Sequence, residues 1–273
     1  FLIFNRPSVI FGMGGYASFP ICTAAILLRI KFIIYENNLI IGRANKSLLP
    51  FTKKLLVSHE EIEGIPKKYH NKILKIGNII KKDIINFKHK KTDNANDNSL
   101  GILVLGGSQA AKIFAEILPK IFQECLTERI PLKIYQHCLQ DQNESLKKFY
   151  ENLDIDYETF NFTDNIIKYF SKVKLAITRS GSSILAELTN ANIPFISVPL
   201  PSSADNHQLK NAIYYKKKNF AFLIEEKDLN HKLLTLIKKI QTDKSVLTEI
   251  IQNQKQYSDK NVYNNIDKAL KEI

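Results

Sequence analysis

A turn of small residues between two apolar runs has the clearest chemistry in this chain. Residues 173–177 predict a strand, residues 179–183 form the small-residue turn, and apolar positions recur at helical spacing across residues 184–188. A helix that opens at such a turn aims backbone N–H groups at an anion. Glu187, about one helical turn in, could accept hydrogen bonds from the paired hydroxyls of a sugar. The segment therefore indicates a site for a phosphorylated, hydroxylated ligand such as a nucleotide sugar.

Two short glycine loops also follow expected strands. Gly106, Gly107, Ser108 and Gln109 stand between a strand at residues 100–105 and a helix, where the glycines would let the backbone approach a ligand. A tight turn with serine as helix cap explains this loop equally well. The loop at residues 12–16 could cradle a diphosphate or simply allow close helix packing. Neither loop has the full dinucleotide fingerprint or the P-loop lysine, which argues against NAD and ATP.

Two further groups of residues suggest contacts to a sugar and a base. A polar cluster that includes His207, Gln208 and Asn211 follows a buried strand and could bind sugar hydroxyls. Phe162 and Thr163 precede a short apolar segment. From the residues alone we expect Phe162 in the core and Thr163 or Asp164 as a helix cap, although an aromatic beside free backbone groups could also hold a base.

The composition is that of a basic globular protein. The chain has 273 residues, 44% of them apolar, and a formal net charge of +12. This charge suits nucleic acid, anionic lipid or a phosphorylated substrate. The three cysteines are widely spaced and predict no disulfide or metal framework, as in a reducing cytoplasm. No apolar stretch reaches the roughly 18 residues of a membrane span, and no signal-peptide pattern is present.

The alternation of strands and helices predicts an α/β protein with parallel sheets. We expect two Rossmann-like domains facing a cleft, with ligands at the carboxyl ends of the strands. A polar stretch at residues 88–98 separates a first domain at residues 1–87 from a second at 99–256, and residues 257–273 predict a helix that packs back on the first domain. Because the chain starts with apolar residues and no methionine, we expect the first domain to be incomplete.

Six motifs in this order resemble the MurG family of bacterial glycosyltransferases, which is glycosyltransferase family 28 with the GT-B fold. They span nearly the whole chain, at residues 12–16, 36–38, 77–78, 106–109, 179–187 and 205–211. The resemblance implies transfer of N-acetylglucosamine (GlcNAc) from UDP-GlcNAc to the C4 hydroxyl of lipid I, which forms lipid II. Lipid II is the precursor of peptidoglycan, so the resemblance also implies a role in cell wall synthesis, cell shape and cell division.

The resemblance also implies how and where the reaction occurs. The reaction would invert the anomeric centre without a metal or other cofactor. The protein would lie peripherally on the cytoplasmic face of the inner membrane, against an anionic membrane surface, and would have no nucleic-acid partner.

The resemblance further implies the residues of the site. Glu187 would hold the ribose hydroxyls, Phe162 and Thr163 the base, and Ser108 the diphosphate. Gly14, Gly15 and Tyr16 would bind the acceptor diphosphate, and Glu36 is the best remaining carboxylate for a general base. The residues expected to bind UDP-GlcNAc are Asn38, Lys81, Ser108, Gln109, Phe162, Thr163, Arg179, Ser182, Ser183, Ile184, Leu185, Ala186, Glu187, His207, Gln208 and Asn211.

Several departures from the family pattern keep alternatives open. The chain lacks the family's first glycine-rich loop, whose histidine is a candidate for the general base. Lys81 replaces a usual arginine, which removes bidentate phosphate geometry. A truncated or split protein that binds UDP-GlcNAc without transferring the sugar is therefore the alternative. A nucleic-acid binder is a distant third, since only the charge suggests it and no RNA-binding signature is present.

Overall fold

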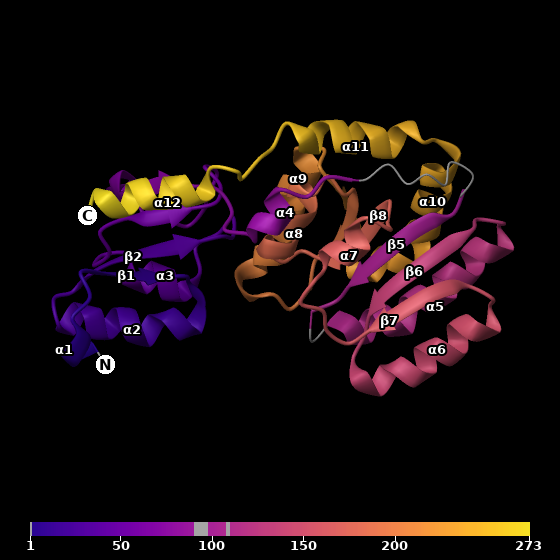
Figure 1. The fold of residues 1–273 in the computed structure, drawn as a ribbon, viewed down its shortest axis with the longest axis horizontal. Helices are drawn as coiled ribbons and strands as arrows, with labels where there is room; N and C mark the ends of the chain where they lie inside the picture. The colour runs from indigo at the N-terminus through magenta and orange to yellow at the C-terminus, as the bar shows by residue number, and fades with distance from the viewer. Residues whose placement is uncertain (1, 90–97, 108–109) are drawn as a thin grey trace. The chain divides into compact units, whose positions relative to one another are not determined.

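The computed structural model describes residues 2–89, 98–107 and 110–273 and divides the chain into two compact units (Figure 1). The first unit is Phe1–Ile80 with Ser258–Ile273, and the second is Lys81–Tyr257. The sequence prediction ended the first domain at residue 87. In the structure, the short helix α4 (Lys82–Ile85) buries Ile84 and Ile85 and belongs to the second unit. Most of the predicted linker lies outside the described residues.

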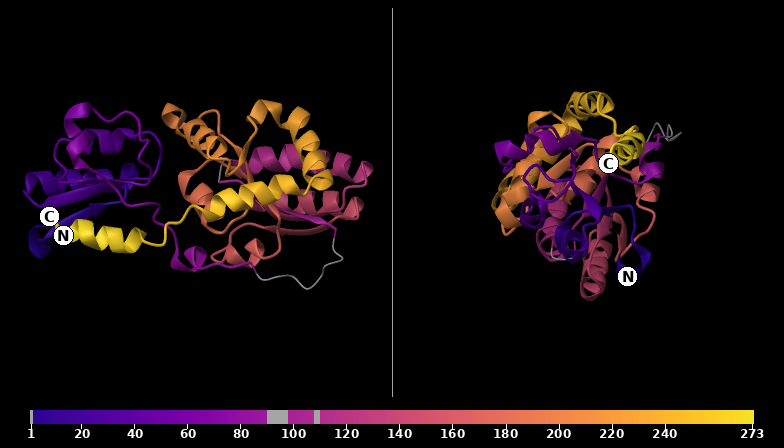
Figure 2. Two further views of the ribbon diagram at one scale, coloured as in Figure 1. Left: turned by 90° about the horizontal axis from the view of Figure 1, so that it is seen from above. Right: turned by 90° about the vertical axis from the view of Figure 1, so that its left-hand side faces the viewer.

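The first unit contains a four-stranded parallel sheet in the order β1-β2-β3-β4. Strand β2 is buried at five consecutive positions because both faces of the sheet are covered. Figure 1 shows helices α2 and α12 on opposite faces, and α12 also lies against this unit in the two views of Figure 2. The elements are α1 (Leu2–Asn5), β1 (Val9–Gly12), α2 (Gly15–Leu27), β2 (Lys31–Glu36), α3 (Arg43–Leu48), β3 (Leu55–Val57), the 3-10 turn η1 (Lys67–Lys72), β4 (Ile73–Lys75) and α12 (Val262–Lys271).

Polar contacts attach helix α12 and the residues before it to the segment that follows strand β4. The carboxylate of Asp259 accepts hydrogen bonds from the backbone N–H of Asn78 at 2.8 Å and from its Nδ2 at 3.3 Å. Asn265 on α12 donates to the carbonyl oxygen of Ile76 at 3.1 Å. These bonds attach a segment far away in sequence to the first unit.

The second unit is built on a six-stranded parallel sheet in the order β10-β9-β8-β5-β6-β7. Its strands are β5 (Leu100–Leu105), β6 (Leu132–His137), β7 (Asp156–Phe160), β8 (Leu175–Arg179), β9 (Phe195–Val198) and β10 (Phe222–Leu223). Its other helices and 3-10 turns are α5 (Ala110–Thr127), η2 (Gln140–Gln142), α6 (Asn143–Asn152), α7 (Ile167–Phe170), α8 (Ser182–Asn190), η3 (Ala204–Asn206), α9 (His207–Lys217), η4 (Glu226–Asp228), α10 (Leu229–Thr242) and α11 (Ser245–Lys255).

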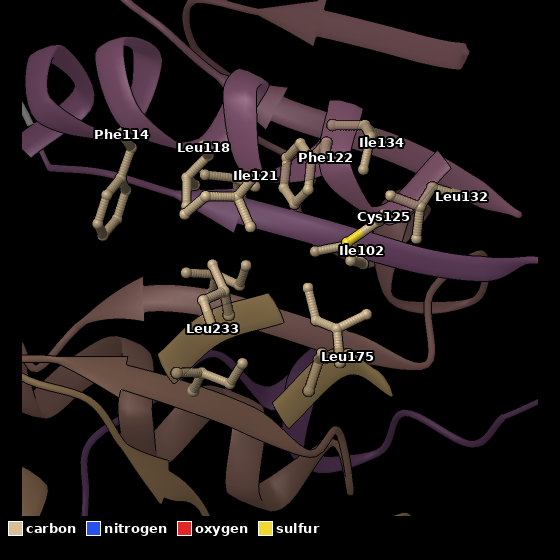
Figure 3. Packing of buried hydrophobic residues seen from close by; sticks show 14 of the residues in the cluster. Ile102, Phe114, Leu118, Ile121, Phe122, Cys125, Leu132, Ile134, Leu175 and Leu233 are labelled. Carbon is tan, nitrogen blue, oxygen red and sulfur yellow. The ribbon is translucent and has the colours of Figure 1, made fainter. Parts of the chain in front are cut away.

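The core of the second unit forms where α5 covers the sheet. Phe114, Leu118, Phe122 and Cys125 recur at helical spacing and are fully buried. Figure 3 shows the α5 side chains directed toward the strands, with Leu233 of α10 in the same cluster. This packing fixes the end of β5 relative to the helix that follows it.

The strand order changes direction between β5 and β8. From β5 the sheet continues through β6 and β7 on one side, and from β8 through β9 and β10 on the other. At such a switch point the loops that leave two neighbouring strands diverge, and open α/β sheets bind ligands in the crevice at this position. Both units therefore have the Rossmann-like form with parallel sheets that the sequence predicted, and the second has an evident ligand position.

Candidate functional site

A pocket of about 430 Å³ lies within the second unit at this switch point. Its walls come from the loops after β5, β6, β7 and β8, together with Lys81 and Ile84 near α4. The volume is in the range of small-molecule sites. The lining residues used below are Lys81, Gly107, His137, Phe160, Phe162, Thr163, Asp164, Arg179, Gly181, Ile184, Glu187 and Gln208.

The turn after β8 gives the pocket the N-terminus of α8. Gly181 is the N-cap with an extended backbone, and Ile184 and Glu187 line the pocket. The positive end of the helix therefore lies beside the space a ligand would fill. Leu185 and Ala186, predicted as binding residues, are fully buried and hold the helix to the core. Ser182 is buried, whereas Ser183 is exposed.

Glu187 is the acidic side chain of the pocket's helical wall. Burial raises the pKa of its carboxyl above the ordinary value, and the ammonium of Lys81 opposes that rise. Lys81 also donates a hydrogen bond from Nζ to the carbonyl oxygen of Asp164 at 3.2 Å. The pocket thus combines a half-buried carboxylate that can accept from hydroxyls with a cation that can attract an anionic ligand.

Aromatic side chains form another part of the pocket. Phe162 is 78% exposed and lines it, so the expectation that Phe162 lies in the core is wrong. The reason is that Phe162 follows the end of β7, where the chain leaves the sheet. Behind it, the rings of His137 and Phe160 lie 5.8 Å apart. Thr163 uses its Oγ1 to accept a hydrogen bond from the N–H of Asn165 at 3.2 Å, as in a turn rather than at the cap of α7.

Gln208 and Asn211 support the turns around the pocket. Oε1 of Gln208 accepts hydrogen bonds from the N–H of Ser180 at 3.2 Å and of Leu200 at 3.0 Å. Its remaining hydrogen-bonding capacity is the pair of donors on Nε2, and the residue lines the pocket. Asn211 is only 1% exposed and donates to the carbonyl oxygen of Ser180 at 3.1 Å. Contrary to its predicted role at the sugar, Asn211 therefore lies beneath the turn.

His207 lies outside the pocket, and Arg179 lines it with a guanidinium that is bonded to other parts of the chain. Nδ1 of His207 bonds the carbonyl oxygen of Ala204 at 2.7 Å, and the side chain does not line the pocket. The guanidinium of Arg179 is buried, pairs with Glu226, and donates to the carbonyl oxygens of Val198 and Pro199. Arg179 lines the pocket, but these contacts pair its guanidinium with η4 and with the end of β9, and so connect both to β8. A direct role at a phosphate is not what this geometry favours.

In the first unit, hydrogen bonds to the Glu36 carboxylate hold together the loop that includes Asn38. Glu36 is 5% exposed, and its carboxylate accepts four hydrogen bonds. The donors are the N–H and Nδ2 of Asn38, the N–H of Gly42 and Nδ2 of Asn45, at 2.9–3.1 Å. A general base needs a free lone pair within reach of the substrate proton, so this geometry differs from what the predicted role of Glu36 requires.

In the glycine loop of the first unit, Gly12 and Gly14 are closely packed, whereas Gly15 has open space around it. A Cβ on Gly12 would lie 2.9 Å from Sγ of Cys22, and one on Gly14 would lie 3.0 Å from the carbonyl oxygen of Tyr35. These two glycines are therefore explained by close packing, and Gly14 also has φ +78°. Gly15 has φ +69° with open space around it, and Tyr16 is exposed at the start of α2.

Ser108 and Gln109 lie outside the described residues. The neighbouring Gly107 lines the pocket, and a Cβ there would meet nothing within 4 Å. The prediction missed His137, Phe160 and Asp164. Each stands at or just after the end of β6 or β7, and the polar sequence of β7 concealed that strand.

The fold and the pocket define a class of protein. Two Rossmann-like units with parallel sheets, one of them with a pocket at its switch point, form the architecture of GT-B glycosyltransferases. Residues 101–266 match the glycosyltransferase family 28 C-terminal domain, and residues 1–57 match the N-terminal domain of that family. The chain belongs to glycosyltransferase family 28.

Curated relatives have one shared name, UDP-N-acetylglucosamine--N-acetylmuramyl-(pentapeptide) pyrophosphoryl-undecaprenol N-acetylglucosamine transferase. The protein of this name from Pelagibacter ubique is 37% identical over 265 residues, which cover 96% of this chain and 73% of the relative. The one from Rickettsia felis is 36% identical over 249 residues, covering 86% of this chain and 69% of the relative.

Solved structures share the fold. Acinetobacter baumannii MurG has a TM-score of 0.79 at 23% identity, covering 100% of this chain and 76% of that one. The UDP-GlcNAc 2-epimerase from Neisseria meningitidis, bound to UDP-GlcNAc, has a TM-score of 0.70 at 14% identity, covering 100% and 78%. Within the described part of the chain, no helix has the length and apolar character needed to span a bilayer.

Proposed function

We propose that this chain transfers GlcNAc from UDP-GlcNAc to the C4 hydroxyl of lipid I, the undecaprenyl-diphosphate-linked muramoyl pentapeptide, and so forms lipid II. The observation that carries the proposal is the pocket at the β5–β8 switch point, where Glu187 and the α8 N-terminus lie beside an exposed aromatic side chain. These groups match the ribose, the diphosphate and the base of a UDP-sugar.

In the proposed complex each part of the donor has its own wall. The uracil lies against Phe162 and the backbone at Thr163, and the ribose hydroxyls donate to the Glu187 carboxylate. The diphosphate lies near Gly107, Ser108 and the start of α8. Donors on Nε2 of Gln208 face the sugar. We assign Arg179, His207 and Asn211 to the support of this site, because their polar atoms bond the surrounding turns.

The proposed reaction is a direct displacement at the anomeric carbon. The acceptor hydroxyl oxygen forms a bond to that carbon and loses its proton to solvent water as the bond to the UDP oxygen breaks, so the diphosphate gains negative charge. The α8 N-terminus and the Lys81 ammonium stabilise this charge. In the first unit, Gly15 and Tyr16 at the start of α2 are proposed to bind the acceptor diphosphate. Glu36 holds the loop at residues 36–45 in shape instead of taking the acceptor proton.

The test is UDP release from UDP-GlcNAc in the presence of a soluble lipid I analogue. We expect acceptor-dependent release that falls at least tenfold in Glu187→Ala. The Glu116→Ala variant is the control, because Glu116 is exposed on α5 outside the pocket. Release that is equally fast in Glu187→Ala would refute the donor-site assignment. Binding of UDP-GlcNAc without acceptor-dependent release would refute transfer by this chain.

We also propose that the first unit binds the cytoplasmic face of an anionic membrane. The support comes from exposed apolar side chains on α1, on α2 and at its start, and from nearby cations at Arg6 and Arg29. Such surfaces enter the headgroup region of a bilayer. The large exposed apolar residues in this part of the chain are Ile3, Phe4, Met13, Tyr16, Phe19, Ile21 and Leu27. Anionic lipid, rather than nucleic acid, is the proposed partner of the basic surface.

Sedimentation with vesicles containing phosphatidylglycerol tests this surface. Phe4 and Leu27 are 90% and 80% exposed, so replacing both with serine should not unfold the chain. We expect this double variant to lose most vesicle binding. Ile213→Ser is the matched control, since Ile213 is 50% exposed on α9 of the second unit. Equal losses in both variants would contradict the assignment.

A further inference from the structure

A second cavity lies in the second unit, at the amino ends of strands in the same sheet. Its volume is about 630 Å³, larger than that of the pocket described above. Leu100 opens β5, Val173 and Lys174 precede β8, and Pro194 precedes β9. The cavity therefore lies at the amino ends of strands whose carboxyl ends surround the first pocket. The two sites are separated by the length of the strands.

The inner wall of this cavity is apolar. Leu100, Val173, Ile193 and Ile240 line it, and each is at most 5% exposed. Helix α11 adds Leu247 and Ile251, and the segment after α4 adds Phe87. An apolar ligand body that leaves water for this cavity would gain about 25 cal/mol for each Å² of its own apolar surface that becomes buried. The cavity therefore favours a ligand with a substantial hydrocarbon part.

The rim of the cavity is positively charged. Lys88, Lys174, Lys244 and Lys255 line it, and all four side chains are exposed. Lys174 donates to the carbonyl oxygen of Ser99 at 3.0 Å, which holds its ammonium near the start of β5. Among the described residues that line the cavity, none is aspartate or glutamate. Lysine stems can pack on apolar surface while their ammonium groups face water or an anion.

We propose that this cavity binds a small anionic amphiphile, with its hydrocarbon body on the inner wall and its acidic head among the rim lysines. The charge complementarity selects this occupant over a neutral or cationic one of the same size. The site is distinct from the donor pocket, and the proposal does not depend on the transferase reaction.

Calorimetric titration of the full chain with three ten-carbon probes tests the proposal. Decanoate and decyl phosphate have acidic heads of different chemistry, and decyltrimethylammonium has the same hydrocarbon chain with a cationic head. We expect at least one acid to bind this cavity, and the comparison of the two acids identifies the preferred head. The cation should bind at least tenfold more weakly than that acid. No binding of either acid, or equal affinity for the cation, would overturn the proposal.

Variants locate the bound amphiphile. The double variant Lys244→Glu and Lys255→Glu should weaken acid binding at least tenfold, whereas Lys232→Glu should not, because Lys232 is exposed near the start of α10 and does not line the cavity. Leu247→Trp should also weaken binding by filling the cavity. Since the chain contains no other tryptophan, a blue-shifted emission verifies that the indole lies in apolar surroundings. Unchanged acid affinity in both cavity variants would place the amphiphile elsewhere, for example on the apolar surface of α1 and α2.

Discussion

Glu187 is the residue whose chemistry is most specific to the proposed donor. An ionised carboxylate can accept hydrogen bonds from both hydroxyls of a ribose diol through its two oxygens, whereas a protonated carboxyl turns one oxygen into a donor and accepts less well. Burial raises the pKa of Glu187, so the ionised fraction should fall at a higher pH than it does for a free glutamate, whose pKa is about 4.3. The chemistry of this one side chain therefore gives the affinity a pH dependence.

Uridine measures that dependence without the titration of a phosphate. We predict that uridine affinity falls as the pH is lowered through the raised pKa of Glu187, and that the Glu187→Gln variant binds weakly with a flat profile. Lys81→Met should move the fall to higher pH, because removing this cation raises the pKa further. Calorimetry at a series of pH values upward from the ordinary glutamate pKa of about 4.3 checks this. A parent profile as flat as that of Glu187→Gln would contradict it.

The same pKa shift makes stability depend on pH in the opposite direction from uridine affinity. A carboxyl whose pKa is raised in the folded state binds its proton more tightly there, so its contribution to stability falls as the pH rises past the unfolded-state pKa. At neutral pH, Glu187→Gln should therefore be at least as stable as the parent, and any loss of uridine binding is not explained by unfolding. Thermal melts of the parent and the variant at about pH 7 provide this comparison.

Phe162 should contribute to binding but not to folding. Its ring is 78% exposed, so replacement by alanine removes little packing. A base stacked on an aromatic ring gains about 1–3 kcal/mol, and we expect Phe162→Ala to weaken UDP binding by that amount with an unchanged melting temperature. Phe51, 57% exposed in the first unit, is the matched control. Loss of stability with unchanged UDP affinity would return Phe162 to the core role first expected.

Glu36 illustrates a residue whose sequence context and surroundings point to different roles. Its carboxylate is the acceptor for four hydrogen bonds in the loop at residues 36–45. An amide at this position offers one oxygen and places an NH₂ group against N–H donors. We predict that Glu36→Gln destabilises the fold by about 1–3 kcal/mol. Glu60→Gln, at an exposed ion pair with Lys75, should change stability much less. Chemical denaturation that gives equal, small losses would argue against the structural role.

At the scale of elements, a glycine explains how α12 is attached. Gly77 has φ +97°, and a Cβ there would lie 2.6 Å from Oδ1 of Asp259. Gly77→Ala should therefore disturb the bonds between Asp259 and Asn78 and destabilise the first unit by about 1–3 kcal/mol. Gly181→Ala is the control, because Gly181 has φ −68° and ample space for a Cβ. Equal melting curves for the two variants would show that this contact is not strained.

Most elements follow from local sequence patterns. The apolar runs at residues 100–105 and 173–177 predicted β5 and β8, because buried parallel strands need apolar side chains on both faces. The prediction missed β4, β7 and β10. Strand β7 has the sequence DYETF and lies at the edge of the sheet, where only partial burial is required, and β10 has two residues. Short or polar edge strands have no periodic signal strong enough to detect.

The candidate site was predictable where the chemistry is local. Gly107, Glu187 and Gln208 were expected from their positions after strands and Ile184 from the family resemblance, and the structure brings all four to one pocket. The surroundings of Arg179 and Asn211 were not predictable, because their partners are distant in sequence or belong to backbone turns. A sequence shows that a polar residue is near a loop end, but only the fold shows which of its atoms are already paired.

At the scale of the whole molecule, each unit has its own sheet and its own buried cluster. The donor pocket is formed by residues of the second unit alone. Binding of a UDP donor therefore depends on the fold of that unit, whereas transfer also requires the acceptor groups proposed for the first. Binding and turnover are separable properties, and binding tests the donor site more directly.

The most direct test is calorimetric titration of UDP-GlcNAc into the full chain and two alanine variants. We predict one binding site, an affinity at least tenfold weaker in Glu187→Ala, and an unchanged affinity in Glu116→Ala. A parent chain that does not bind UDP-GlcNAc, or a Glu187→Ala variant that binds it as tightly as the parent, would contradict the assignment of the donor to the β5–β8 switch point.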